Sequence, residues 1–202
     1  MLKIVSREVD DERVVEAFRR VAREDFVPPG FEGEAYNDRP VPLPQRQTTS
    51  QPSLIARMVE AAVSGKTERI LEVGTGYGFQ TALLAHIASA AVSIERHAEL
   101  AEAARANLHR AGIVNADVFV GDGWEGWPDK APYDAIVVSA AAEETPRALT
   151  EQLAEGGRLV VPLARGRSDD VVVLVKEGGR VVQDRLITPA RFVPLVRGRA
   201  DA

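Results

Sequence analysis

The sequence predicts an α/β fold built on a mostly parallel, doubly wound sheet whose C-terminal strands are antiparallel. Between residues 69 and 163, short apolar segments typical of buried strands alternate with longer segments of helical periodicity, the pattern of β-α-β crossovers. After Gly166 two strand-like segments are separated only by a glycine turn, which indicates a hairpin. We expect core strands near 69–73, 91–95, 116–120, 133–139 and 157–163, and helices near 79–89, 97–111 and 143–154.

The length of the chain, 202 residues, suffices for one well-buried core and is short for two. We therefore expect a single domain. It should comprise an N-terminal helix and long loop over residues 1–65, a central core over 66–165, and a C-terminal hairpin and edge strand over 166–202. In this last part, residues 171–175 and 180–187 are the expected hairpin strands, and Phe192 to Val196 is expected to close the sheet edge.

The N-terminal third combines two predicted helices with a long irregular segment. Residues 10–23 have apolar side chains at helical spacing, and Asp10 and Asp11 stand near the start, where the helix dipole favours negative charge. Residues 26–52 are rich in proline, glycine and polar residues and show no period; their aromatic and apolar side chains favour an ordered binding loop or lid. A second apolar helix should start at Ser50-Gln-Pro-Ser53 and end at Ser64-Gly65.

The composition is that of an acidic globular protein. With a net charge of −5 and a pI near 5.4, the chain lacks the excess of cations needed to follow nucleic-acid phosphates, so we expect no nucleic-acid partner. The absence of cysteine excludes disulfides, thiolate metal sites and a thiol nucleophile. His86, His97 and His109 lack ligand spacing, so no metal site is expected. The sequence has no signal-peptide core and no span-length apolar stretch, which predicts a cytoplasmic protein without a membrane partner.

A glycine-rich turn follows the first core strand and suits a nucleotide-like cofactor. Gly74, Gly76 and Gly78 allow the backbone to turn sharply and to approach a ligand that a β-carbon would exclude. Glu95 ends the next strand roughly 20 residues after Gly74, the offset at which a carboxylate meets ribose hydroxyls. The two features together predict a cofactor site at this strand end.

The spacing of the glycines also indicates which cofactor is bound. A dinucleotide site needs G-x-G-x-x-G, but Phe79 occupies the last glycine position, which disfavours a pyrophosphate and a nicotinamide-dependent oxidoreductase. Glu72 precedes the turn and would attract an ammonium group while repelling phosphate. These features fit S-adenosylmethionine, although Glu72 has an alternative interpretation as a strand-end residue paired with Arg69.

Further polar residues follow the third and fourth core strands, whose carboxyl ends should meet the same ligand. Asp122 is placed to accept a hydrogen bond from an adenine amino group, and Gly123 allows a close approach of the ring. The alternative for Asp122 is a solvated turn aspartate. Small residues at 139–141 leave room for the methyl donor.

Eight segments together resemble the protein-L-isoaspartate (D-aspartate) O-methyltransferase family, and the resemblance extends over nearly the whole chain. The more specific ones are Gln47-Thr-Thr-Ser-Gln-Pro52 and Arg191-Phe-Val-Pro-Leu195, because the cofactor turn Leu71-Glu-Val-Gly-Thr-Gly76 is common to many methyltransferases. The others are Arg23-Glu-Asp-Phe-Val-Pro28, Ala35-Tyr-Asn-Asp38, Ser93-Ile-Glu-Arg96, Gly121-Asp-Gly-Trp124 and Pro132-Tyr-Asp-Ala-Ile136.

The resemblance implies a Rossmann-like methyltransferase that transfers a methyl group from S-adenosylmethionine to the free α-carboxylate of isoaspartyl residues in damaged proteins. Separately from the resemblance, we expect a monomer. It implies Ser50 as the active-site serine and substrate contacts from Gln47, Thr48 and Thr49. The cofactor contacts that it implies are Glu72, Gly74, Thr75, Gly76, Glu95, Arg96, Asp122 and Gly123.

Several alternatives stay open at this point. Ser50 precedes a predicted helix and is therefore also a good N-cap. Family members commonly have glycines where this chain has Pro44, Gln45 and Arg46, which makes the loop stiffer and more cationic and affects the shape of the substrate pocket. The acceptor could instead be another peptide or a small acid, or the chain could bind the cofactor without catalysis.

Overall fold

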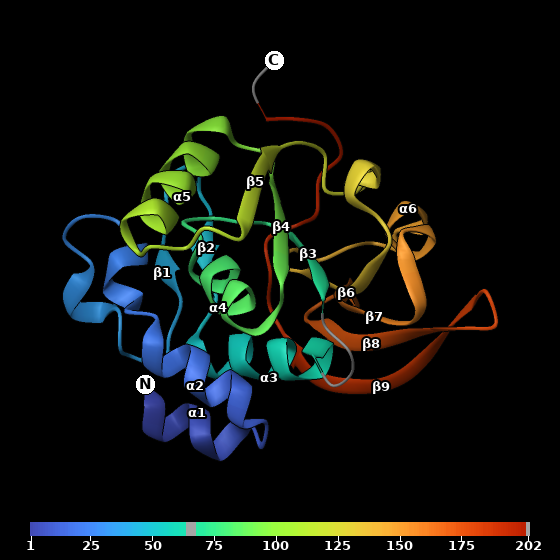
Figure 1. Ribbon diagram of the computed structural model, residues 1–202, viewed down its shortest axis with the longest axis horizontal. Helices are drawn as coiled ribbons and strands as arrows, with labels where there is room; N and C mark the ends of the chain where they lie inside the picture. Colours follow the sequence, from blue (N-terminus) through green and yellow to red (C-terminus); the bar gives the residue numbers. More distant parts are fainter. Residues whose placement is uncertain (64–67, 201–202) are drawn as a thin grey trace.

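The computed structural model describes residues 1–63 and 68–200, and its centre is a seven-stranded sheet (Figure 1). The strand order is β5-β4-β3-β6-β7-β8-β9; the pairs from β5 to β7 are parallel, and β8 and β9 are antiparallel to their neighbours. The strands are β3 (Arg69–Val73), β4 (Ala90–Glu95), β5 (Ala116–Val120), β6 (Tyr133–Val138), β7 (Leu153–Ala164), β8 (Asp169–Glu177) and β9 (Arg180–Ala190). The predicted fold class is confirmed.

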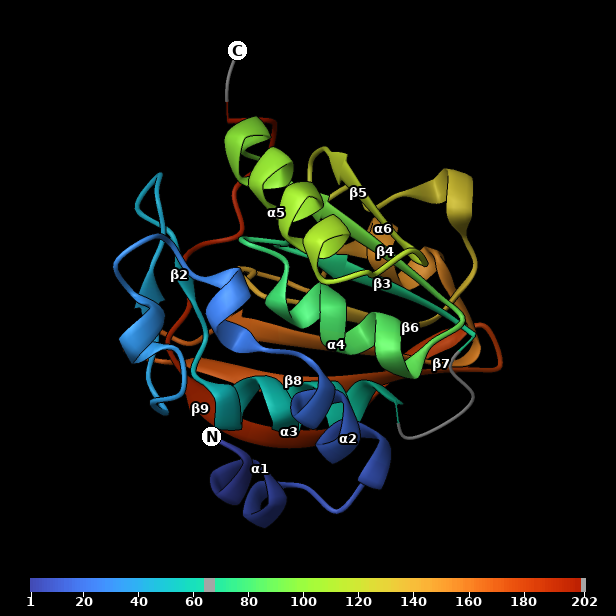
Figure 2. The same ribbon diagram turned by 60° about the vertical axis from the view of Figure 1, so that its left-hand side comes forward.

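Helices cover one face of the sheet more heavily than the other. The helices are α1 (Leu2–Glu8), α2 (Glu12–Arg20), α3 (Pro52–Val63), α4 (Phe79–Ile87), α5 (Ala98–Arg110) and α6 (Arg147–Glu151). Ile70 of β3 packs in the same buried cluster as side chains of α1 to α5. Its neighbour Leu71 points the opposite way, as strand geometry requires, and packs with Trp124, Tyr133 and Leu149 of α6. Figure 2 shows α3 lying along β8 and β9, with α1 and α2 below it.

The register of the central strands brings three loops to the same edge. Val73, the last residue of β3, lies opposite Ile94 of β4 and Val138 of β6. Backbone hydrogen bonds continue past the strand ends, from Gly74 N to Ile94 O at 2.8 Å and from Ser139 N to Val73 O at 2.8 Å. The residues that directly follow β3, β4 and β6 are therefore neighbours at the carboxyl edge of the sheet, where ligands of doubly wound folds bind.

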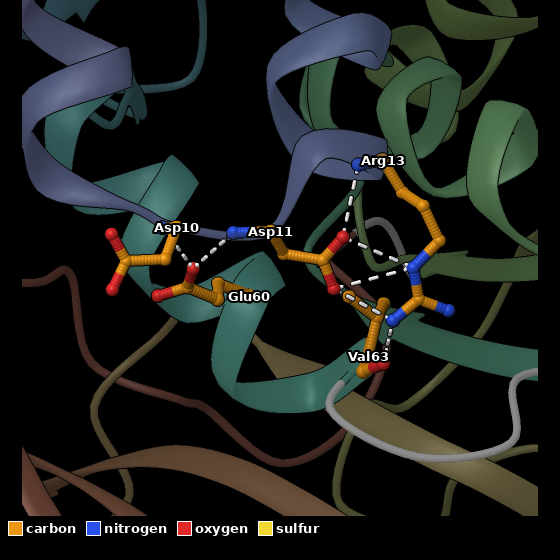
Figure 3. A network of polar contacts seen from close by, with 5 residues as sticks. All are labelled: Asp10, Asp11, Arg13, Glu60 and Val63. Carbon is orange, nitrogen blue, oxygen red and sulfur yellow. Dashed lines mark hydrogen bonds and ion pairs between the residues drawn. The ribbon is translucent and has the colours of Figure 1, made fainter.

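The two N-terminal helices are attached to α3 by a polar network (Figure 3). Glu60 of α3 accepts hydrogen bonds from the backbone N–H groups of Asp10 and Asp11, at 2.6 and 2.8 Å. The Asp11 carboxylate caps α2 by accepting from Arg13 N, and the Arg13 guanidinium reaches Val63 O at 2.6 Å. This network holds the helix that follows Ser50 against the N-terminal helices.

The irregular segment 26–52 is ordered by short elements. Residues Arg23–Phe26 and Glu32–Glu34 form 3-10 turns (η1 and η2), and β1 (Val41–Pro42) pairs antiparallel with β2 (Thr48–Thr49). A third 3-10 turn, η3 (Pro128–Lys130), precedes β6. The prediction of an ordered segment is consistent with this arrangement.

Some expected elements differ from the structure. The sequence did not predict α1, and the expected helix 143–154 is confined to Arg147–Glu151 because the chain enters β7 at Leu153. The expected end of α3 at Ser64-Gly65 lies outside the described residues. The expected edge strand Phe192 to Val196 is wrong, because β9 is the edge of the sheet. Its residues instead bond the loop after β6, from Ala141 N to Val193 O and from Leu195 N to Ala141 O, and so cross the carboxyl edge.

Within the part of the chain that the structure describes, no helix is long and apolar enough to cross a membrane.

Candidate active site

A cavity of about 100 Å³ lies at the carboxyl edge of β3, β4 and β6. The core wall, as we name one side, consists of residues 72–77, 94–96, 123 and 139–140 from the strand-end loops. The acceptor wall opposite consists of residues 47–50 of the irregular segment and residues 193–196 of the C-terminal segment. Every sequence-predicted site residue except Asp122 lines this cavity.

Glycines make the core wall a surface of backbone. Gly74 and Gly76 have φ of +94° and +55°, a region that L side chains rarely adopt. A β-carbon at Gly76 would also lie 3.1 Å from the side chain of Leu43, which lines the cavity as well. At Gly123 a β-carbon would collide with Val73. These positions leave room for a ligand between the two walls.

Glu95 is held with its carboxylate toward the glycine turn. One oxygen accepts from Gly76 N at 2.9 Å and the other from His97 N at 3.0 Å, and the residue is only 5% exposed. Because an ionised carboxylate has about four acceptor positions, two remain for a ligand. This geometry suits the pair of hydroxyl groups on a ribose.

Glu72 also lines the cavity and is almost completely buried. Its carboxylate accepts hydrogen bonds from Gln80 Nε2 at 3.0 Å, from Ser93 Oγ at 2.6 Å and from Thr81 Oγ1. Burial raises the pKa of Glu72 to about 7, against the opposing effect of these hydrogen bonds. The alternative ion pair with Arg69 is wrong, because these three donors hold the carboxylate and the Arg69 guanidinium donates to Lys130 O.

Thr75 and Arg96 also line the core wall. The Thr75 hydroxyl is buried and lies 2.6 Å from the Ser93 hydroxyl, which connects it to the Glu72 network. The Nε atom of Arg96 is buried without a hydrogen-bond partner among the described residues. A polar ligand in the cavity would be able to satisfy it.

Asp122 differs from the other predicted cofactor residues. Its two oxygens accept from Trp124 N at 2.8 Å and from Gly198 N at 2.6 Å. The carboxylate thus ties the C-terminal segment to the loop after β5, and Arg197 lies over the Trp124 ring at 4.2 Å. The structure does not place Asp122 among the cavity residues, although Gly123 beside it is one.

On the acceptor wall, Ser50 does not cap α3. The helix begins at Pro52, two residues later, and its Ser53 N–H is capped by Asp38 Oδ1 at 2.9 Å. The Ser50 hydroxyl has no hydrogen-bond partner among the described residues, while its backbone oxygen accepts from Arg23. Of the two roles that the sequence left open, the geometry favours the one facing the ligand.

Arg23 is a fully buried residue that the sequence analysis did not identify as functional. It donates to Ala35 O at 2.7 Å, to Thr49 Oγ1 at 2.8 Å and to Ser50 O at 3.0 Å. Its guanidinium also lies 5.6 Å from the ring centroid of Phe79, the first residue of α4. Burial lowers the pKa of Arg23 to about 10, so the side chain stays charged at neutral pH. The sequence could not indicate this role of Arg23, because its partners are backbone oxygens and a hydroxyl and not an acidic residue at a recognisable spacing.

Comparison with known proteins agrees with the geometry. The family model of protein-L-isoaspartate(D-aspartate) O-methyltransferase matches residues 2–200. The chain belongs to this family. A protein-L-isoaspartate O-methyltransferase of Methanoculleus marisnigri is 47% identical over 96% of this chain and 88% of its own length. One from Methylorubrum populi is 46% identical over 97% of this chain and 92% of its own length.

Solved structures of the isoaspartate methyltransferase family have the same fold. One structure of a protein-L-isoaspartate O-methyltransferase superimposes with a TM-score of 0.86 at 29% identity. The match covers 96% of this chain and 64% of that one. A Plasmodium falciparum structure in complex with S-adenosyl-L-homocysteine, which carries the same family name, gives a TM-score of 0.81 at 23% identity. The match covers 96% of this chain and 97% of that one. The resemblance that the motifs indicated is confirmed.

Proposed function

We propose that this chain is a protein repair methyltransferase, which transfers a methyl group from S-adenosylmethionine to the free α-carboxylate of L-isoaspartyl residues in damaged proteins. Family membership over residues 2–200 supports the reaction and the cofactor. The assignment of individual residues rests on the geometry of this chain.

The observation that carries the proposal is the meeting of two cavities at Ser50. A second cavity, of about 280 Å³, opens beside the first and extends between α3 and the end of β9. We name it the acceptor groove. Both cavities are lined by Thr48, Thr49, Ser50, Ser139 and Val193. Ligands bound in the two cavities would therefore meet at this shared border, beside the Ser50 hydroxyl, which has no hydrogen-bond partner among the described residues.

The described residues fit S-adenosylmethionine. The glycine turn admits the cofactor, Glu95 would accept from its ribose, and Glu72 would face its cationic part. When bound, S-adenosylmethionine supplies an electrophilic methyl group on a sulfonium. We assign Gly74, Thr75, Gly76, Arg96 and Gly123 to cofactor contacts as well, because they line the same wall.

The acceptor needs little activation. An α-carboxylate with an ordinary pKa near ~4 is already ionised at pH 7 and requires no strong general base. The work of the protein is then to hold one carboxylate oxygen in line with the methyl group and to exclude water. Ser50 would donate a hydrogen bond to that carboxylate. The Thr49 oxygen already accepts from Arg23 and from Val41 N, which fixes the side chain while leaving its proton free to donate.

Gln47 and Thr48 complete the proposed acceptor wall. Gln47 O accepts from Leu43 N at 2.8 Å, and its side chain donates to Gln45 O, so this residue shapes the β1–β2 turn next to the groove.

We further propose that the enzyme acts as a monomer in the cytoplasm.

A paired-peptide assay tests the proposal. Two peptides that differ only in an isoaspartyl or an aspartyl linkage are incubated with methyl-labelled cofactor, and labelled methyl ester is counted. We expect labelling of the isoaspartyl peptide alone. Equal labelling would favour a broader carboxyl methyltransferase, and cofactor binding measured by calorimetry without labelling of either peptide would favour a non-catalytic relative.

A further inference from the structure

The acceptor groove differs in charge from the protein as a whole. The chain carries a net charge of −5, yet among the described residues that line the groove only Arg57 of α3 and Arg191, directly after β9, are charged. The remaining lining residues are uncharged, and serine and threonine contribute several of the groove's hydroxyl groups. A ligand in this groove therefore meets positive charge.

Both arginines donate to backbone carbonyls of the protein. Arg57 Nη2 donates to Ile187 O at 2.7 Å, and Arg191 Nε donates to Arg167 O at 3.2 Å. Both acceptors are backbone carbonyls, which orient a guanidinium without cancelling its charge. Among the described ion pairs, neither arginine has a carboxylate partner, in contrast to Arg147, which pairs with Glu151 at 2.7 Å.

The Arg57 side chain is already held in place by the protein and still has free N–H donors for a ligand. Arg57 is half-buried on α3, and its hydrogen bond to Ile187 O ties it to β9. Because a guanidinium has five N–H donors and this contact uses only Nη2, donors remain for a ligand. A carboxylate is the group that matches such a planar fork of donors.

We propose that Arg57 and Arg191 determine substrate specificity by selecting acceptor sites with an acidic side chain close to the isoaspartyl residue. The inference rests on the proposed function, because it assigns the groove to the polypeptide that flanks the methylated residue. The two arginines would contact the acidic flank, while Ser50 at the border of the groove would contact the α-carboxylate. Acidic stretches of damaged proteins would then be preferred acceptors.

A peptide series measures this preference in the unmodified enzyme. Isoaspartyl peptides carry Glu, Gln or Lys in turn at each of the two positions before and after the isoaspartyl residue, and kcat/KM is determined at saturating cofactor. At one or more positions we expect Glu to exceed Lys roughly fivefold or more, the effect of one to two partly exposed ion pairs. The ratio should fall as the ionic strength rises from about 0.05 to 0.5 M, since salt screens exposed charges.

Variants assign the preference to the two arginines. In Arg57→Gln/Arg191→Gln the Glu-to-Lys ratio should approach one, whereas Arg57→Lys/Arg191→Lys should retain most of it. Arg147→Gln, which removes a paired surface charge on α6, should leave the ratio unchanged. Cofactor affinity, measured by calorimetry, verifies that each variant is folded.

Two kinds of failure can be told apart. Methylation of isoaspartyl peptides without a Glu-to-Lys preference at any position would overturn the role of the arginines and leave the repair function intact. A preference that survives in the double glutamine variant would also overturn it. Absence of methylation from every isoaspartyl peptide would overturn the proposed function itself.

Discussion

The core wall and the acceptor wall of the cofactor cavity are fixed by different means. On the core wall, Gly74 and Ser139 are held by backbone hydrogen bonds that extend the register of β3, β4 and β6. On the acceptor wall, Thr49 and Ser50 lie in a segment with little regular structure and are held by the side chain of Arg23. The first wall depends on strands that are adjacent in the sheet, whereas Thr49 and Ser50 of the second depend on one buried residue more than 25 positions away in the sequence.

This difference separates the two binding functions. Damage to the acceptor wall should affect the peptide more than the cofactor, and damage to the core wall should do the reverse. Arg23 connects the acceptor wall to α4, because its guanidinium contacts both Ser50 O and the ring of Phe79 at the start of that helix. Substitutions on the two sides therefore test how independent the walls are.

The largest effect is expected from Arg23→Lys. Lysine cannot reach the carbonyls of residues 35 and 50 and the Thr49 hydroxyl together, so buried acceptors lose their donors at about 1–3 kcal/mol each. We expect the free energy of unfolding to fall by about 3 kcal/mol or more, and kcat/KM for an isoaspartyl peptide to fall at least tenfold. Cofactor affinity should change less than threefold. Urea unfolding, peptide kinetics well below the melting temperature and calorimetry measure the three quantities.

A control for this substitution is Arg20→Lys, on the exposed surface of α2, where the arginine pairs with Glu16. It should change none of the three quantities appreciably. If Arg23→Lys lowered stability while the peptide KM and kcat stayed at their normal values, Arg23 would be a purely structural residue and the acceptor wall would not depend on it.

Ser50→Ala should have the next largest effect, confined to the reaction. Removing a hydrogen bond to a charged group costs about 1.5–3 kcal/mol, so kcat/KM should fall about 10- to 100-fold. Because Asp38 caps α3, we expect the melting temperature to stay within about 1 °C and cofactor affinity to stay unchanged. Peptide kinetics and thermal unfolding, with Ser6→Ala in α1 as the control, measure this. A fall in the melting temperature with normal turnover would restore the capping role.

The two walls also differ in how much of them the sequence predicts. The core wall follows from local patterns: a strand, a positive-φ glycine turn and a carboxylate at the end of the next strand, which is why Glu95 and Gly76 come together as expected. The capping of α3 could not be predicted in this way, since Asp38 reaches Ser53 from outside the helix. The mistaken edge strand at 192–196 has a similar origin, because its apolar pattern does not reveal that its partner is the loop at Ala141.

The β1–β2 turn shows a related limit. Gln45 and Arg46 have φ of +58° and +56°, the conformation for which glycine is suited. The turn therefore adopts a backbone shape typical of glycine although both positions carry side chains. Gln45 also donates to Glu99 of α5 at 2.9 Å, which offers a contact that glycine lacks.

Glu95→Gln should weaken cofactor binding by about tenfold. The substitution replaces one carboxylate oxygen with an NH2 group, a donor that would face either a backbone N–H or the ribose. Calorimetric titration with S-adenosylhomocysteine measures the affinity, and Glu102→Gln on the exposed surface of α5 is the control. At saturating cofactor the peptide KM should stay within twofold of the normal value. An unchanged cofactor affinity would remove Glu95 from the site, and an altered peptide KM would mean that the walls are coupled.

The smallest effect on binding is expected at Glu72, and it should depend on pH. Since burial raises the pKa of Glu72 from 4.5 to about 7 in the folded protein, the unfolded chain loses this proton between pH 4.5 and 7 while the folded protein keeps it. The carboxyl therefore lowers stability progressively over this interval, by up to about 3 kcal/mol above pH 7. Glu72→Gln should be as stable as the normal protein near pH 4.5 and more stable at pH 8.

Cofactor binding should show the opposite trend. Only the ionised carboxylate attracts a cationic ligand, so the affinity of the normal protein for S-adenosylmethionine should rise about fivefold from pH 6 to 8, and that of Glu72→Gln should stay flat. S-adenosylhomocysteine keeps the ammonium group but lacks the sulfonium charge, so comparing the two ligands shows which cation Glu72 faces. If the normal protein and the variant bound both ligands with the same pH dependence, the Glu72 carboxylate would act only through its hydrogen bonds to Gln80, Thr81 and Ser93, as a brace for the core wall.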